Sequence, residues 1–171
     1  MDNIDQLLNP FYHARKPFTQ SWVDFFIDVA VLASSRSKDE STKVGCVLVD
    51  PESMSPLTFA YNGVPRHISE NPDHNIRPEK YFWWTHAEQN AIANCARLGI
   101  KTDGSYLFLT QQPCSDCVRL IIQAGIDVVV VQKTEEWQDY DTRWFESISR
   151  GRLMLNEAAV ILIWSDGKGI E

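Results

Sequence analysis

Apolar positions recur along the chain with two different periods, and each period indicates one kind of element. Spacings of three and four residues predict helices, over residues 19–34, 86–98, 113–124 and 143–157. Short runs of β-branched and apolar residues between turn signals predict five strands, over residues 43–50, 57–61, 105–110, 127–132 and 160–164. The order is therefore one helix, a strand hairpin, and then strands that alternate with helices.

This order of elements predicts the fold class. Two adjacent strands with a short connection pair antiparallel, whereas a strand–helix–strand unit returns its second strand parallel to the first. We expect an α/β fold of three layers, α/β/α, in which a mixed five-stranded sheet has helices on both faces. Four consecutive valines, residues 128–131, are typical of a central buried strand.

The 171 residues suit a single domain over residues 1–171, but two segments lack a periodic pattern. Residues 1–17 contain two prolines and predict a loosely structured N-terminal arm. Residues 64–85 contain three prolines and mixed charges, and they predict a long irregular loop at the active site. The loop ends in four aromatic residues, 81–84, which we expect to pack at its base rather than to stack on a ligand.

Two short motifs each open a predicted helix. A His-x-Glu motif occupies residues 86–88, and a Pro-Cys-x-x-Cys motif occupies residues 113–117. The 25 residues from 89 to 113 that separate the motifs form one helix–strand unit. Such a unit returns the chain to the same edge of the sheet, so we expect the two helix starts to lie side by side.

The residue types in these motifs predict a metal site. Cys114 and Cys117 share one face of a first helical turn, where the helix dipole favours thiolates. With the imidazole of His86 they make three ligands suited to Zn²⁺, and a fourth position open to water is typical of a catalytic zinc. Cys95 lies about half a helical turn out of phase with His86, and Cys46 lies inside a strand. Both are predicted to be buried thiols, which leaves one zinc ion per chain.

Glu88 is predicted to transfer protons beside that ion rather than to bind it. A His-x-Glu motif followed by Pro-Cys-x-x-Cys is the signature of the zinc-dependent nucleobase deaminases. Further segments resemble the deoxycytidylate deaminases of the cytidine deaminase superfamily, and they follow one another in that family's order. They are residues 37–45, 61–66, 86–92 and 121–126, and the resemblance covers about residues 20–165.

The resemblance implies hydrolysis of deoxycytidylate (dCMP) to deoxyuridylate and ammonia, which supplies a precursor of dTTP. It implies that a zinc-activated water attacks C4 of the base and that Glu88 passes its proton to N3. It also implies that the backbone of Ala87 and Cys114 holds the base and that Asn62 contacts the sugar. Relatives further suggest a homo-oligomer, commonly a hexamer, and regulation by dCTP or dTTP.

The chain departs from the family pattern at two places. Gln111 and Gln112 precede the cysteine motif where many relatives have an apolar or aromatic residue. His67 stands where a glycine is common. Both departures concern the shape of the pocket, so the base could be plain or 5-substituted cytosine.

Charge limits the class of substrate. Acidic residues outnumber basic ones by 23 to 16, and the net charge of −7 disfavours stable binding to bulk nucleic acid. A single phosphate needs only a few cations. Arg36, Lys38, Lys43 and Arg66 lie in or beside loops that we expect at the pocket rim. We favour Arg36 and Arg66 because a guanidinium can grip phosphate bidentately.

Alternatives remain open from the sequence. The same chemistry would serve a free cytosine nucleoside, a 5-substituted dCMP or a tRNA adenosine, although the last would favour a basic surface. A structural-zinc binding module would need a fourth ligand, which the spacing does not supply. No apolar run has the length of a transmembrane helix and residues 1–5 do not resemble a signal peptide, so we expect a cytoplasmic protein without membrane contact.

Overall fold

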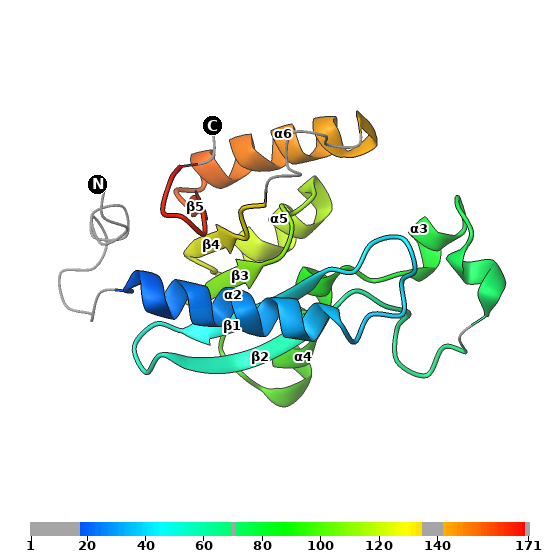
Figure 1. Cartoon of the computed structure of the whole chain (residues 1–171), viewed down its shortest axis with the longest axis horizontal. Helices are drawn as coiled ribbons and strands as arrows, with labels where there is room; N and C mark the ends of the chain where they lie inside the picture. Colours follow the sequence, from blue (N-terminus) through cyan, green and yellow to red (C-terminus); the bar gives the residue numbers. More distant parts are fainter. Residues whose placement is uncertain (1–17, 70, 135–141, 170–171) are drawn as a thin grey trace.

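The computed structural model of the chain describes residues 18–69, 71–134 and 142–169 (Figure 1). The strands are β1 (Gly45–Asp50), β2 (Ser55–Tyr61), β3 (Tyr106–Leu109), β4 (Val128–Val131) and β5 (Ile161–Trp164). The helices are α2 (Gln20–Ser34), η2 (Pro72–Asn75), α3 (Lys80–Trp83), α4 (Ala87–Leu98), α5 (Ser115–Gln123) and α6 (Thr142–Glu157), η2 being a 3₁₀ helix. The predicted arm over residues 1–17 lies outside the described residues.

The five strands form one mixed sheet in the order β2-β1-β3-β4-β5. Strand β1 pairs antiparallel with both β2 and β3, whereas β3, β4 and β5 run parallel. The carboxyl ends of β2, β3, β4 and β5 therefore meet the start of β1 at one edge of the sheet. The four valines form β4, which is buried and interior but not the middle strand, a place that β3 takes.

Alternate residues of the strands build two cores, one on each face of the sheet. Val47, Phe108 and Val130 pack with Phe26 of α2 on one face. Their neighbours along each strand pack on the other face with residues of α4, α5 and α6. This alternation is the period of two that a strand imposes on its side chains. The predicted three-layer fold with helices on both faces is confirmed (Figure 1).

Two helix boundaries differ from the prediction in the same way. The helices predicted from residues 86 and 113 begin at Ala87 and Ser115, and His86 and Cys114 precede them as N-caps with extended backbone. An N-cap residue leaves the helical conformation while its carbonyl accepts the first helical bond, which apolar spacing alone does not reveal. Both side chains thereby gain a direction that differs from that of a residue inside the helix.

The segment 64–85 is less irregular than predicted, because it contains η2 and α3. Its aromatic residues contribute to this order. The ring of Trp83 stacks on His74 with centroids 3.7 Å apart, and the indole N–H of Trp84 donates to the carbonyl oxygen of His74. The expected packing role is correct for Trp83. Tyr81 and Trp84 also line a cavity, which is described below.

Helix α2 packs against β1 with almost no space between their backbones. A Cβ atom on Gly45 would lie 2.0 Å from the carbonyl oxygen of Ala30 and 2.5 Å from the amide nitrogen of Ser34. Both contacts are with backbone, which cannot turn aside as a flexible side chain can. None of the helices within the described ranges is long and apolar enough to cross a membrane.

We expect Gly45→Ala to lower the free energy of unfolding by about 3 kcal/mol or more, at the upper end of overpacking costs. Urea unfolding measures this change. Gly169→Ala is the matched control, because its added methyl group would meet no atom within 4 Å. Equal stability of the two variants would show that α2 can move away from β1 at little cost.

Candidate active site

Two helix N-termini meet at the carboxyl end of β3. Helix α5 follows β3 in the chain and begins at its carboxyl end. Helix α4 precedes β3 and runs antiparallel to it, so α4 begins at that same edge of the sheet. The start of α4 is secured locally, because the backbone N–H of His86 donates to Oε1 of Gln89. It is also tied to the end of β2, where the Asn90 side chain donates to the carbonyl oxygen of Tyr61.

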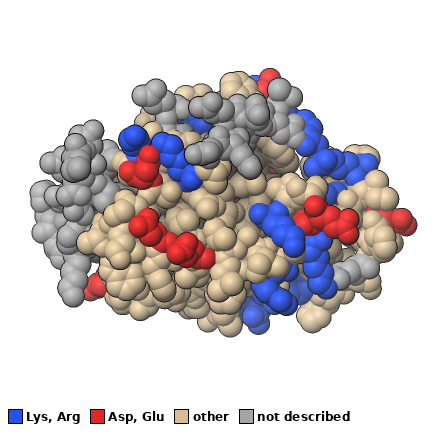
Figure 2. Space-filling view, viewed as in Figure 1, with Lys and Arg blue, Asp and Glu red and all other residues tan. Residues whose placement is uncertain are grey.

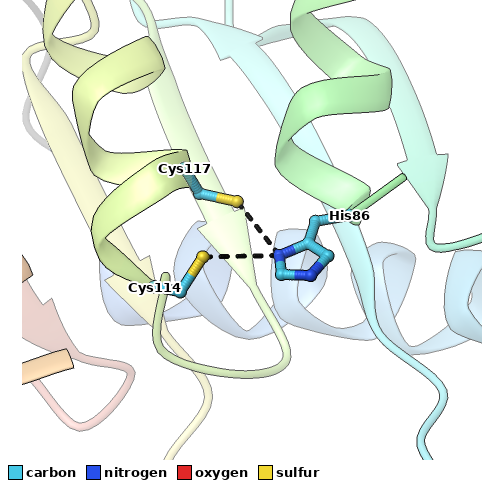
Figure 3. A group of neighbouring side chains, drawn as sticks. All are labelled: His86, Cys114 and Cys117. Carbon is cyan, nitrogen blue, oxygen red and sulfur yellow. Dashed lines mark hydrogen bonds between the residues drawn. The ribbon is translucent and has the colours of Figure 1, made fainter. Parts of the chain in front are cut away.

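His86, Cys114 and Cys117 converge between these helix starts (Figure 3). The sulfur atoms of Cys114 and Cys117 lie 3.4 and 3.3 Å from Nδ1 of His86. The three ligand atoms all lie within 4.8 Å of one another. The structure therefore brings together the three residues that the sequence predicts as metal ligands.

The donor set fits a zinc ion. Zn–S bonds of about 2.3 Å and Zn–N bonds of about 2.0 Å in a tetrahedron separate S and N by roughly 3.5 Å. The observed separations of 3.3 and 3.4 Å are close to that value. Two thiols and one imidazole are soft or borderline donors, which are typical of zinc rather than of magnesium or calcium.

Hydrogen bonds within this group set the pKa values of its members apart. A hydrogen bond from Cys117 lowers the pKa of Cys114 to about 4, and a hydrogen bond from His86 adds to this effect, although burial opposes it. The hydrogen bond between the two cysteines raises the pKa of Cys117, and the bond to Cys114 raises the pKa of His86 to about 9. The lowered pKa of Cys114 favours its thiolate, which is the form of cysteine that binds a metal.

The other two cysteines lie outside the group, as predicted. Cys46 and Cys95 are fully buried in the core between the sheet and α4. The thiol of Cys46 donates to the carbonyl oxygen of Ala87 at 3.2 Å, and burial raises its pKa well above the usual value. Among the residues that the structure describes, the metal group therefore has three protein ligands and no fourth.

The carboxyl of Glu88 lies beside the metal group in the second position of α4. It is buried, with 4% of its surface exposed, and it lines the same cavity as His86 and Cys114. Burial raises the pKa of this carboxyl above its usual value, and the positive charge of His86 offsets that rise only in part. A carboxyl with a raised pKa at a cavity wall is suited to accept and return a proton.

The cavity itself has a volume of about 130 Å³ and opens beside the metal group. Its wall combines the metal group with residues of segment 37–44, α3 and α6. The lining residues are Asp39, Thr42, Val44, Asn62, Arg77, Lys80, Tyr81, Trp84, Thr85, His86, Ala87, Glu88, Gln111, Gln112, Cys114, Trp144 and Ile148. The predicted base and sugar residues Ala87, Cys114 and Asn62 are among them.

The predicted phosphate residues are not in this wall. Arg36 and Lys38 line a wider hollow of about 730 Å³, which shares Asn62 and Trp84 with the cavity. Arg66 lies on neither wall and donates a hydrogen bond to Asn94 of α4. Of the four candidate cations, the structure therefore places Arg36 and Lys38 next to the cavity and none in its wall.

Several wall residues were missed by the sequence reasoning. Lys80 and Asp39 form a buried ion pair, and the Asp39-x-Ser-Thr pattern is typical of a turn in which a carboxylate accepts backbone N–H bonds. That pattern could have singled out Asp39. Trp144 had no such signal, because only the fold brings its ring to 5.9 Å from that of His86.

Comparisons with known proteins agree with this geometry. The family model of the cytidine and deoxycytidylate deaminase zinc-binding region matches residues 20–133. An uncharacterised deaminase of Aliivibrio fischeri is 34% identical over 143 residues, covering 84% of this chain and 92% of that relative. The deoxycytidylate deaminase of Homo sapiens is 33% identical over 145 residues, covering 81% of this chain and 76% of that relative.

A solved structure shares the whole fold. The dCMP deaminase from the cyanophage S-TIM5, in complex with dCMP and dUMP, superposes with a TM-score of 0.68 at 28% identity. The superposition covers 86% of this chain and 98% of that chain. The chain therefore belongs to the cytidine and deoxycytidylate deaminase family, and His86, Cys114 and Cys117 lie within the residues that the zinc-binding region matches.

We expect the wild-type protein to hold about one zinc ion per chain. His86→Ala, Cys114→Ala and Cys117→Ala should each lose the ion, because each removes one of three donors. Metal content by atomic emission measures this loss.

Cys46→Ser and Cys95→Ser are the matched controls for those cysteine variants, since both thiols lie outside the group. They should retain the ion. A zinc content that falls in either control would reveal a role in metal binding that the geometry does not give them.

Proposed function

We propose that this protein hydrolyses dCMP to deoxyuridylate and ammonia, and so supplies a precursor of dTTP. The observation that carries the proposal is the convergence of a three-ligand metal group and a buried carboxyl, Glu88, on one small cavity. Relatives with the same fold are named deoxycytidylate deaminases, and one of them was solved with dCMP and dUMP.

The proposed chemistry assigns the proton transfers to Glu88. His86, Cys114 and Cys117 would hold a zinc ion, which would supply a water molecule with a pKa near neutrality. Glu88 accepts the proton of that water and delivers it to N3 of the cytosine ring, and C4 gains the hydroxyl oxygen. Glu88 then takes the proton of the C4 hydroxyl and passes it to the amino group, and the C4–N bond breaks to leave a C4 carbonyl and ammonia. The raised pKa of this buried carboxyl supports its return of the proton.

The cavity wall supports recognition of a pyrimidine nucleotide. We propose that backbone groups of Ala87 and Cys114 hold the base edge, while Trp144 and Ile148 of α6 cover the ring. Asn62 is the proposed sugar contact, because it lines both the cavity and the adjoining hollow.

Phosphate recognition is proposed for Arg36, Lys38 and Arg66. On the face drawn in Figure 2, Lys and Arg gather at the end of the molecule where α3 and its neighbouring loops lie. Arg36 and Lys38 line the hollow beside the cavity, which supports a phosphate bound just outside it. A local positive field on a chain of net charge −7 would attract an anionic substrate.

We further propose that residues 1–171 act as one deaminase domain that works as a homo-oligomer in the cytoplasm. Large exposed apolar side chains support association, among them Leu32 at 72% exposure and Phe82 at 80%. Regulation by dCTP or dTTP, and the choice between plain and 5-substituted cytosine, stay predictions from the resemblance. Activity assays with each nucleotide test the regulation and the choice of base, and light scattering tests the oligomeric state.

Glu88→Gln should keep the zinc ion and lose turnover by at least about a hundredfold, since general acid–base catalysis contributes roughly 10²–10⁴. Metal content and ammonia release are measured on the same preparation. Glu157→Gln, an exposed change at the end of α6, is the control and should be fully active. Near-normal turnover in Glu88→Gln would remove the proton-transfer role.

Arg36→Ala and Arg66→Ala should each lower kcat/KM on dCMP by about tenfold or more, because a charge-assisted hydrogen bond contributes roughly 1.5–3 kcal/mol. The same variants should leave the residual activity on deoxycytidine nearly unchanged, since that substrate has no phosphate. Parallel assays on both substrates separate these effects.

Arg97→Ala is the matched control for the arginine variants, because Arg97 lies in the last turn of α4, away from the cavity. It should leave both activities unchanged. Equal efficiency of the wild type on dCMP and deoxycytidine would instead favour a nucleoside deaminase.

A further inference from the structure

A buried ion pair forms part of the cavity wall, and the proposed chemistry does not use it. Nζ of Lys80 lies 2.5 Å from Oδ2 of Asp39, and the two side chains are only 11% and 2% exposed. Lys80 also donates to the hydroxyl of Ser41 at 2.8 Å. Burying two charges costs free energy unless each is well paired and hydrogen-bonded. Their position therefore calls for a role at the cavity.

Asp39 is saturated by donors from the protein. Its Oδ1 accepts hydrogen bonds from the backbone N–H of Ser41, the hydroxyl of Ser41 and the backbone N–H of Thr42, at 2.8, 2.9 and 3.0 Å. Its Oδ2 accepts from Lys80 and from the side-chain amide of Asn62. Burial alone would raise the pKa of Asp39, but these donors hold it below the usual value. A carboxylate that accepts five bonds organises its neighbours rather than binding substrate.

Asn62 is held by the same network. The side-chain NH₂ group of Asn62 donates two hydrogen bonds. One goes to Asp39 at 3.1 Å and the other to the carbonyl oxygen of Thr42 at 2.9 Å. The amide oxygen accepts from the backbone N–H of Val44 at 2.8 Å. An amide oxygen has two lone pairs, so one acceptor position remains. Because Asn62 lines the cavity, that position is the polar group it can offer to a ligand hydroxyl.

We propose that Lys80 is a positioning residue for the substrate sugar: through Asp39 it orders segment 37–44 and orients Asn62, so that the Asn62 amide oxygen accepts a hydrogen bond from the 3′-hydroxyl. The inference rests on the proposed function only for the choice of nucleotide. Lys80 itself begins α3, so the network also ties this short helix to the sheet.

A substrate without the hydroxyl tests this role. We expect Lys80→Met to raise KM for dCMP on the order of tenfold with little change in kcat, as the loss of one good hydrogen bond would. 2′,3′-Dideoxycytidylate lacks the 3′-hydroxyl. On that substrate the KM of Lys80→Met should stay within about twofold of the KM of the wild type. An equal rise on both substrates would overturn the proposal, because general damage to the cavity does not depend on that hydroxyl.

Two variants support the comparison. Lys80→Arg keeps the positive charge and should recover most of the affinity for dCMP. Lys101→Met is the matched control, because Lys101 is 77% exposed and pairs with Asp103 at the surface. Should Lys80→Met fail to fold, Asp39→Asn breaks the same ion pair with a side chain of the same size, and the same contrast between substrates is expected.

Amide hydrogen exchange tests whether Lys80 orders segment 37–44, and this measurement does not depend on enzyme activity. The backbone N–H groups of Ser41, Thr42 and Val44 are bonded within the network, so they should exchange about tenfold faster or more in Lys80→Met than in Lys101→Met. Unchanged exchange would overturn the proposal. A wild type that turns over neither nucleotide would refute the proposed function, while the exchange rates would still decide whether Lys80 orders this segment.

Discussion

The sheet changes from antiparallel to parallel pairing at β3, and the metal group depends on that change. Because β1 pairs antiparallel with β3 and β4 pairs parallel with it, the crossovers through α4 and α5 bring two helix starts to one strand end. His86 and Cys114 are N-caps there, with Cys117 one turn further on. This arrangement places both sulfurs within 3.3–3.4 Å of Nδ1 of His86.

Buried charge is concentrated around this edge, and each instance has a compensating partner. Glu88 is buried beside the group that would hold a zinc ion, whose positive charge would offset part of the cost of burial. Asp39 is buried with Lys80 and accepts backbone N–H bonds as well. Burying a charged group lowers the stability of the folded protein unless a partner charge and hydrogen bonds compensate it. Here Asp39, Lys80 and Glu88 all line one small cavity, where we propose that chemistry and ligand binding occur.

Local patterns account for most of what the sequence predicted correctly. The three-layer fold, the five strands and the convergence of the two motifs follow from apolar periods and from the handedness of crossovers. The helix starts were displaced by one or two residues, because capping depends on backbone hydrogen bonds that periodicity does not report. The long loop predicted over residues 64–85 contains two short helices, η2 and α3, which its prolines and mixed charges did not reveal.

The sequence by itself indicated the candidate metal donors, the proton-transfer candidate and the class of fold, because short motifs and local apolar periods carry each of them. Only the tertiary structure decided which distant residues complete the cavity. Asp39 meets Lys80 across 41 positions, and Trp144 reaches His86 from another helix. The tertiary structure likewise placed Arg36 and Lys38 in the hollow beside the cavity, while Arg66 bonds to Asn94 of α4 outside both. Long-range contacts of this kind arise from how layers pack, and no local spacing encodes them.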